Sequence, residues 1–231
     1  DRLYVEKADG LKRRSAQTVC WYILDTLTRL IAPILSFAAE QISDNYQKDK
    51  KESIHLQQFA DLDWIIDALI GQFIANRPGF RTFEMSGGQT LDMLESQKFL
   101  SEKYAQWDAL KSLRSALLKE IEEQRQQGNI KHSLEAKLTI FIGDSCGDKE
   151  LLDQFFNDIK YSDQKPENFM KEFMIVSKVN FVDSKDDLDE TEMLGVFAKA
   201  ECADGTKCPR CWQWDKAESA EGLCPRCTKI V

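Results

Sequence analysis

The strongest constraint in this sequence is a set of four cysteines near its end, arranged as two matching pairs. Each pair has the form Cys-Pro-Arg-Cys, and twelve residues separate Cys208 and Cys211 from Cys224 and Cys227. Two residues between cysteines let one tight turn present both sulfurs to one metal ion, and zinc prefers four tetrahedral ligands. Disulfides would need an oxidising compartment, and a Cys-x-x-Cys bridge is more typical of a redox site. The pattern therefore predicts one structural Zn²⁺ held by four thiolates.

This predicted zinc segment is too short to fold by apolar burial. A stretch of about 25 residues cannot build a stable core, so metal ligation must supply its folding free energy. Four thiolates leave no open coordination position, which excludes zinc-hydroxide catalysis. The metal is expected to make a rigid platform, and side chains on that platform would carry any recognition.

The composition indicates a folded, cytoplasmic protein. The chain has 231 residues, of which 42% are hydrophobic and 30% charged, enough for one or two domains. We expect no membrane association, because no apolar run is long enough to cross a bilayer and no secretory leader opens the chain. The first residue, Asp1, indicates a processed product or a fragment. Cys20, Cys146 and Cys202 are scattered, which fits a reducing cytoplasm.

The net charge of −8 is concentrated in one part of the chain. Residues 144–192 hold 14 acidic and 6 basic residues, which accounts for the whole excess. The region before this segment is nearly neutral, and the zinc segment is slightly basic. The charge therefore argues against indiscriminate binding of polyanions but leaves local basic faces available.

Helical periodicity dominates the first half of the chain. Apolar residues recur at three- and four-residue steps over 15–42 on more than one face, which predicts a helix buried inside a bundle. Ser15 is a suitable N-cap, Pro33 should kink or split this helix, and Cys20 should be buried within it. A second helix is expected over 65–73.

The longest helical pattern runs over residues 101–127. It follows an irregular loop expected over 77–90, and Gly128 is a plausible helix stop. Its apolar face is expected to consist of Trp107, Leu110, Leu113, Leu117, Leu118 and Ile121. Its opposite face carries Lys111, Arg114, Lys119 and Arg125 among several acids.

The second half of the chain is predicted to form a small unit that contains both helices and strands. Strands are expected over 138–142, 173–182 and 193–200, a short helix over 150–159 and a solvated loop over 184–192. Cys146 would lie in an exposed turn.

We therefore expect a mainly α fold with a small α+β unit and three parts. A helical bundle would span 1–137, an α/β junction unit 138–200, and a four-cysteine zinc ribbon 201–231.

Several separate motifs along the chain match one family in the same order. They are Asp1–Tyr4, Arg14–Val19, Leu24–Leu35, Ser53–Leu56, Trp107 with Leu113–Arg114, Ser133–Ala136, Gly205–Trp212 and Leu223–Cys227. Together they resemble the anticodon-binding helical domain and C-terminal zinc finger of bacterial-type isoleucyl-tRNA synthetases, which are class I aminoacyl-tRNA synthetases. Synthetases for valine and leucine share the helical domain, but the four-cysteine finger favours isoleucine. The segment 66–100 looks longer than the family's usual connection.

The resemblance implies a tRNA-binding piece of a larger enzyme. The family's His-x-Gly-His and Lys-Met-Ser-Lys-Ser motifs, which hold ATP and the adenylate, do not occur in the sequence. ATP would therefore bind only in a catalytic domain upstream, and this chain alone should charge no tRNA. Its expected partners are the anticodon arm of isoleucine tRNA and the catalytic and editing domains of the same polypeptide. A monomer is expected.

The predicted RNA contacts lie on the zinc finger and the long helix. Trp212 sits beside basic residues, a combination that suits stacking on an unpaired base and pairing with phosphates. The alternative is that Trp212 and Trp214 pack beneath the finger; of the two, Trp212 is favoured as RNA-facing. The predicted tRNA-binding residues are Arg210, Trp212, Arg226, Lys229, Arg114 and Lys111.

Three alternatives stay open at this point. In the first, Arg114 bridges to an internal carboxylate and holds two helices together rather than contacting phosphate. In the second, the finger clamps the end of the chain onto the enzyme body without touching bases. A DNA-repair finger is a more distant option, because the catalytic residues of DNA glycosylases do not occur.

Overall fold

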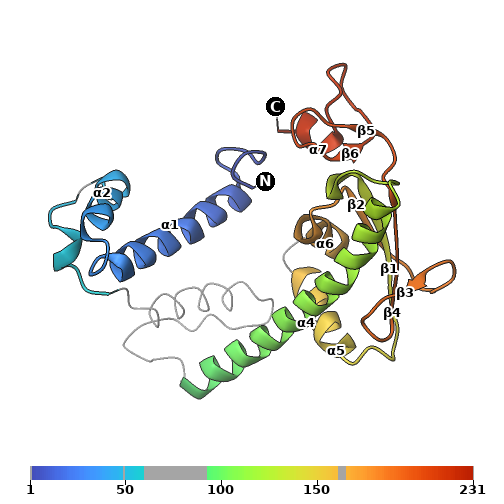
Figure 1. The fold of residues 1–231 in the computed structure, drawn as a ribbon, viewed down its shortest axis with the longest axis horizontal. Coiled ribbons are helices and arrows are strands. Elements are labelled where there is room, and N and C mark those ends of the chain that lie inside the picture. Colours follow the sequence, from blue (N-terminus) through green and yellow to red (C-terminus); the bar gives the residue numbers. More distant parts are fainter. Residues whose placement is uncertain (1, 49, 60–92, 161–164, 231) are drawn as a thin grey trace. The chain divides into compact units, whose positions relative to one another are not determined.

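The structure is a computed structural model that describes residues 2–48, 50–59, 93–160 and 165–230 (Figure 1). The chain divides into two compact units, residues 1–74 and residues 75–229. None of the described helices is both long and apolar enough to span a membrane. The expected helix over 65–73 and loop over 77–90 lie outside the described residues.

The described part of the first unit contains two α-helices. Helix α1 spans Leu11–Ile31 and α2 spans Ser36–Tyr46, followed by a short 3₁₀ turn, η1, at Ile54–Leu56. The break between α1 and α2 contains Pro33, so the predicted split at this proline is confirmed. Helix α1 begins before Ser15, with Gly10 as its N-cap.

The prediction that this segment is buried inside a bundle is wrong for the described residues. The core of the first unit consists of Ala32, Ala39 and Ile54 with Ile31 packed against it. Large apolar side chains of α1 and α2 are exposed instead, with Leu27 at 53% and Phe37 at 90%. Cys20 is also exposed rather than buried. Apolar residues on more than one face of α1 and α2 exceed what so small a core can cover.

A polar cluster around Glu40 joins α2 to the start of η1. Glu40 accepts hydrogen bonds from Lys50 Nζ at 2.7 Å, Ser53 Oγ at 2.8 Å and the Ile54 backbone N–H at 3.1 Å. The Lys50 hydrogen bond, assisted by that of Ser53, holds the pKa of Glu40 below its ordinary value of 4.5.

The second unit is a four-stranded mixed sheet with helices on one side (Figure 1). Its strand order is β2-β1-β4-β3; β1 pairs with β2 in parallel and with β4 antiparallel, and β3 pairs antiparallel with β4. The elements are α4 (Met93–Gln126), η2 (Ser133–Glu135), β1 (Ala136–Ile142), α5 (Lys149–Lys160), α6 (Pro166–Met174), β2 (Lys178–Phe181), β3 (Asp189–Glu190) and β4 (Val196–Cys202).

Helix α4 shares one hydrophobic core with the sheet. Leu110, Leu113 and Leu117 of the predicted apolar face are fully buried, and Leu138 and Ile140 of β1 lie in the same cluster. The helix ends near Gly128, whose φ of +77° suits the left-handed position that stops a helix. The sequence placed this helix with residues 1–137, whereas the structure groups it with the α/β elements.

Two local predictions in this unit are wrong. The expected strand over 173–182 begins only at Lys178, because α6 occupies the preceding segment up to Met174. Pro166 stands in the first turn of α6, and Ile175 ends it with a φ of +58°. Cys146 is buried in the core rather than exposed in a turn.

The cysteine-rich end forms a separate small ribbon after β4. Strands β5 (Thr206–Lys207) and β6 (Trp214–Asp215) pair antiparallel, and a one-turn helix, α7 (Pro225–Thr228), follows. Gly205 is needed at the start of β5, since its φ is +103° and an added Cβ would lie 2.3 Å from the Asp215 carbonyl oxygen.

Candidate metal centre and nucleic-acid interface

The ribbon brings the sulfurs of Cys208, Cys211, Cys224 and Cys227 together. All four Sγ atoms lie within 4.8 Å of one another, and those of Cys211 and Cys224 are 3.6 Å apart. Tetrahedral zinc with bonds of about 2.3 Å would place its sulfurs about 3.8 Å apart. The spacing therefore suits a single tetrahedral metal ion, and all four cysteines are buried.

Backbone hydrogen bonds shape the two turns that present these sulfurs. The Cys208 N–H donates to the Gln213 carbonyl at 2.9 Å, and the Trp212 N–H donates back to the Cys208 carbonyl at 2.9 Å. In the second pair, Cys224 is the N-cap of α7 and Pro225 follows in the first turn. The Cys224 N–H also points at the Cys208 sulfur, 3.5 Å away, which ties the two turns to each other.

The electrostatics of the four thiols favour a cation at their centre. Burial raises the pKa of Cys208, but the backbone N–H groups of Cys211, Cys224 and Arg210 outweigh it and lower that pKa to about 6. Burial raises the pKa values of Cys211 and Cys227. Sulfurs this close repel one another when ionised, so all four can be thiolates together only with a cation between them.

The position of Arg210 is independent evidence that the cysteine cluster accommodates negative charge. Its guanidinium contacts the sulfur of Cys227 and favours the thiolate form of that residue. Its Nη1 atom is buried and has no hydrogen-bond partner among the described residues. A zinc ion with four thiolates carries a net charge of about −2, which a neighbouring guanidinium offsets. The residues present therefore fit zinc.

The ribbon is tied to the end of the sheet by Ser177. Its hydroxyl accepts the Trp214 backbone N–H at 2.6 Å and donates to the Leu134 carbonyl. The Ala203 N–H donates to the Glu135 carbonyl at 2.7 Å, which fixes the chain between β4 and β5. These bonds hold the ribbon at the end of the sheet that carries the first residues of β1 and β2.

The two tryptophans of the ribbon occupy different environments. Trp212 is 59% exposed and has a φ of +64°, so its turn holds a large aromatic side chain in a backbone conformation that favours glycine. Lys207 Nζ lies 5.0 Å from the centre of the Trp212 ring. Trp214 is half-buried and its backbone is anchored by Ser177. An exposed aromatic ring beside a cation suits stacking on a base next to a phosphate.

The basic side chains predicted on α4 all have partners. Lys111 is exposed and pairs with Asp108 at 2.6 Å, while Lys119 pairs with Glu192 and Arg125 pairs with Glu122. Arg114 is half-buried; it donates to the Phe173 carbonyl at 3.2 Å and lies 5.6 Å from the centre of the Phe173 ring. It thus joins α4 to α6 through a carbonyl, whereas the structural alternative expected a carboxylate.

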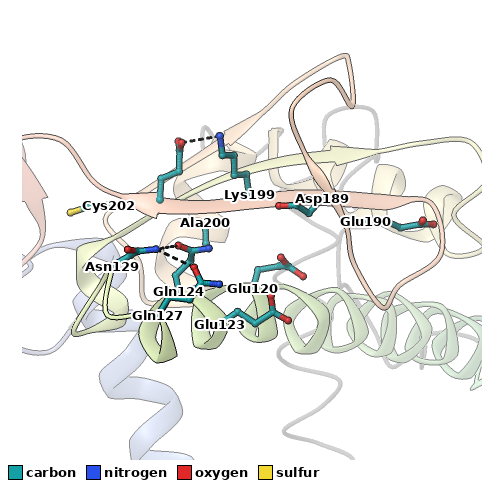
Figure 2. Close-up of a pocket in the computed structure, with 11 residues that line it drawn as sticks. Glu120, Glu123, Gln124, Gln127, Asn129, Asp189, Glu190, Lys199, Ala200 and Cys202 are labelled. Atoms are coloured by element: carbon teal, nitrogen blue, oxygen red, sulfur yellow. Dashed lines mark hydrogen bonds and ion pairs between the residues drawn. The ribbon is translucent and has the colours of Figure 1, made fainter.

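An acidic groove of about 630 Å³ lies between α4 and the strands β3 and β4 (Figure 2). Glu120 and Glu123 line it from α4, and Asp189 and Glu190 line it from β3. Burial raises the pKa of Glu120, and the charges of Glu123, Asp189 and Glu192 raise it further. This groove repels a polyanion, which limits where RNA can contact the second unit.

The candidate residues thus fall into two groups within the second unit. The ribbon carries the four cysteines, Arg210 and Trp212; Arg226 is half-buried on α7, and Lys229 is its exposed C-cap. Lys111 and Arg114 lie on α4 instead. Ser177 was not among the predicted site residues, because no sequence pattern marks a hydroxyl that bonds two backbone groups from distant segments.

Comparison with known proteins gives one consistent result. The family model for the anticodon-binding domain of tRNA ligase matches residues 1–140. Over its full length, the chain is 32% identical to an isoleucine–tRNA ligase from Caldicellulosiruptor bescii, 34% to one from Syntrophotalea carbinolica and 32% to one from Thermotoga maritima. The chain spans about a fifth of those relatives, covering 20%, 21% and 21% of their lengths.

Proposed function

Since the chain belongs to the family of tRNA ligases that carry an anticodon-binding domain, we propose that it binds the anticodon arm of isoleucine tRNA. The match to isoleucine–tRNA ligases along the whole chain supports isoleucine as the amino acid. One structural observation carries the proposal: an exposed Trp212 beside Lys207, displayed on a turn that the four-cysteine cluster holds.

The ribbon would contact the RNA through Trp212 and nearby cations. Zinc, bound by Cys208, Cys211, Cys224 and Cys227, would fix the two turns and take no part in chemistry, because four thiolates fill its coordination sphere. The Trp212 ring would stack on an unpaired base of the anticodon loop, with Lys207 beside it for a phosphate.

The other cations have distinct proposed roles. Arg210 lies against Cys227, so its proposed role is to offset the charge of the metal centre, and RNA contact by Arg210 stays a prediction. Arg226 and Lys229 on α7, and Lys111 and Arg114 on α4, stay predicted backbone contacts that would position the arm without reading its sequence.

The whole enzyme's activity is part of the same proposal. The chain would be the C-terminal region of an isoleucine–tRNA ligase that works in the cytoplasm as a monomer. Catalytic and editing domains of the same polypeptide would bind ATP and attach isoleucine, and this chain alone would charge no tRNA.

Mobility shifts with the zinc-loaded chain test the proposal. The chain should bind isoleucine tRNA at low salt and bind a non-cognate tRNA of equal length more weakly, because the non-cognate tRNA has different bases in its anticodon loop. Equal, negligible affinity for both would contradict the proposal.

A second candidate function is structural, and the Ser177 anchor favours it. That anchor ties the ribbon to the sheet, and in this alternative the ribbon serves only to clamp the end of the chain. Under this alternative, replacing Trp212 leaves tRNA affinity unchanged, whereas the RNA-binding proposal expects affinity to fall.

A further inference from the structure

The sheet of the second unit has one face covered by helices and one open face. Along β1 and β4, residues alternate between buried and partly exposed positions. The buried set, which includes Leu138 and Ile140, contacts the core shared with α4, α5 and α6. Those helices lie on one side of the strands (Figure 1). The alternate residues therefore point to the other side.

Strand register arranges the open face as rows of side chains across β2, β1 and β4. Lys178 pairs with Lys137, which pairs with Glu201. The next open row places Asn180 beside Thr139 and Thr139 beside Lys199.

The row after that places Phe141 opposite Phe197. Figure 2 shows Lys199 pointing away from α4, as this register requires.

The open face carries more positive than negative charge. Glu201 pairs with both Lys137 and Lys199 at 3.2 Å, so one carboxylate is shared by two ammonium groups. Lys178 on the neighbouring strand is exposed. Register adds Glu190 of β3, which lies opposite Phe197 and also lines the acidic groove. On the helix side of these strands, Glu120 and Glu123 of α4 line the acidic groove, so that side is more negative than the open face.

An aromatic pair adjoins these cations. The rings of Phe141 and Phe197 have centroids 6.2 Å apart, and Lys185 Nζ lies 5.0 Å from the centre of the Phe197 ring. Lysines around half-exposed aromatic rings on a flat sheet form a surface typical of single-stranded nucleic-acid binding, where phosphates meet cations and bases meet rings.

We propose that this open face, centred on Lys178, Lys199 and the Phe141–Phe197 pair, binds unpaired nucleotides of an RNA loop. The inference rests on the proposed tRNA-binding function and extends it from the ribbon to the sheet. Because Ser177 and the start of β1 fix the ribbon at the Lys137–Lys178 end of the sheet, one loop can contact both surfaces. A duplex stem should bind this face more weakly, because its bases are already stacked and paired and cannot stack on the Phe rings.

The test compares two double variants of the zinc-loaded chain. Lys178→Gln with Lys199→Gln removes two cations from the open face. Lys149→Gln with Lys165→Gln is the matched control, since it removes the same charge from α5 and from the start of α6, on the helix side. The probes are the anticodon stem–loop of isoleucine tRNA and the same stem as a duplex without the loop. Circular dichroism and zinc content establish that each variant is folded.

The open-face variant should bind the stem–loop about tenfold more weakly, and its salt slope should fall by about 1.4, near 0.7 for each lost single-strand phosphate contact. The control should keep most of the wild-type affinity, and Lys178→Arg with Lys199→Arg should restore it. An open-face variant that binds the stem–loop like the control overturns the sheet proposal and leaves tRNA binding by the ribbon intact. A wild-type chain that binds no tRNA overturns both.

Discussion

At the residue scale, Trp212 combines features that packing alone does not require. Its ring is exposed, its backbone has a positive φ, and a lysine lies over the ring. Holding a bulky residue in that conformation costs about 1–3 kcal/mol. If only the turn were needed, glycine at this position would give a more stable protein. We therefore infer that the Trp212 side chain has a function that offsets the cost of its backbone conformation.

Replacing Trp212 with glycine should therefore separate stability from binding. We expect Trp212→Gly to melt at or above the wild-type temperature, because the strained backbone is relieved. Its affinity for isoleucine tRNA should fall at least about fivefold, since one stacked base contributes about 1–3 kcal/mol. Trp214→Leu is the control; it should lower the melting temperature, because the Trp214 ring is half-buried. Unchanged affinity for Trp212→Gly would support the structural alternative.

Glu40 gives a second prediction at this scale, in the first unit. Its folded pKa is below 4.5, so its bonds to Lys50 and Ser53 stabilise the fold fully above that pH. The stabilisation is lost as the pH falls through the lower, folded value. Glu40→Gln should melt below wild type at pH 7, and the gap should shrink below about pH 4. Glu52→Gln, at an exposed carboxylate in the loop before η1, is the control and should melt closer to wild type at pH 7. A gap for Glu40→Gln that does not depend on pH would contradict this account of Glu40.

At the element scale, short elements were harder to predict than long ones. Helix α4 was predicted from its long helical periodicity, and strand β1 was predicted from the apolar run over 138–142. The last residues of α6, Phe173 and Met174, were predicted as the start of a strand. Phe169 and Phe173 contact Trp107 on α4, a tertiary contact that local propensity does not contain. The open face of the sheet is visible as an alternation in β1, where Lys137, Thr139 and Phe141 alternate with buried residues. The expected strand over 138–142 left out Lys137 and therefore showed less of this alternation.

The ribbon gives the prediction that belongs to this scale. Purified chain should hold about one zinc ion, and Cys208→Ser should lose it together with the folded ribbon. Cys202→Ser is the matched control: Cys202 lies six residues earlier, is exposed and stands outside the four-sulfur group, so zinc content should not change. Zinc measured by atomic emission in both variants decides the point, and equal zinc in the two would refute the assignment of ligands.

At the scale of the whole molecule, charge and family membership together support the proposed binding of RNA. The net charge is −8, and part of that excess lines the groove between α4, β3 and β4. Cations gather instead on the open sheet face and on the ribbon. The grouping of the four cysteines and the relationship to tRNA ligases could be predicted from residue spacing and motifs. The grouping of α4 with the sheet could not, because which core a helix joins depends on contacts far apart in sequence.

The central claim is that a four-thiolate metal centre shapes a surface that binds isoleucine tRNA. Its most direct test is the affinity of the chain for that tRNA before and after zinc is removed by a chelator, then after zinc is returned. The account predicts at least a tenfold loss on removal, with recovery on reconstitution, because the turn that displays Trp212 depends on the metal. An affinity that stays the same in the metal-free chain would contradict it.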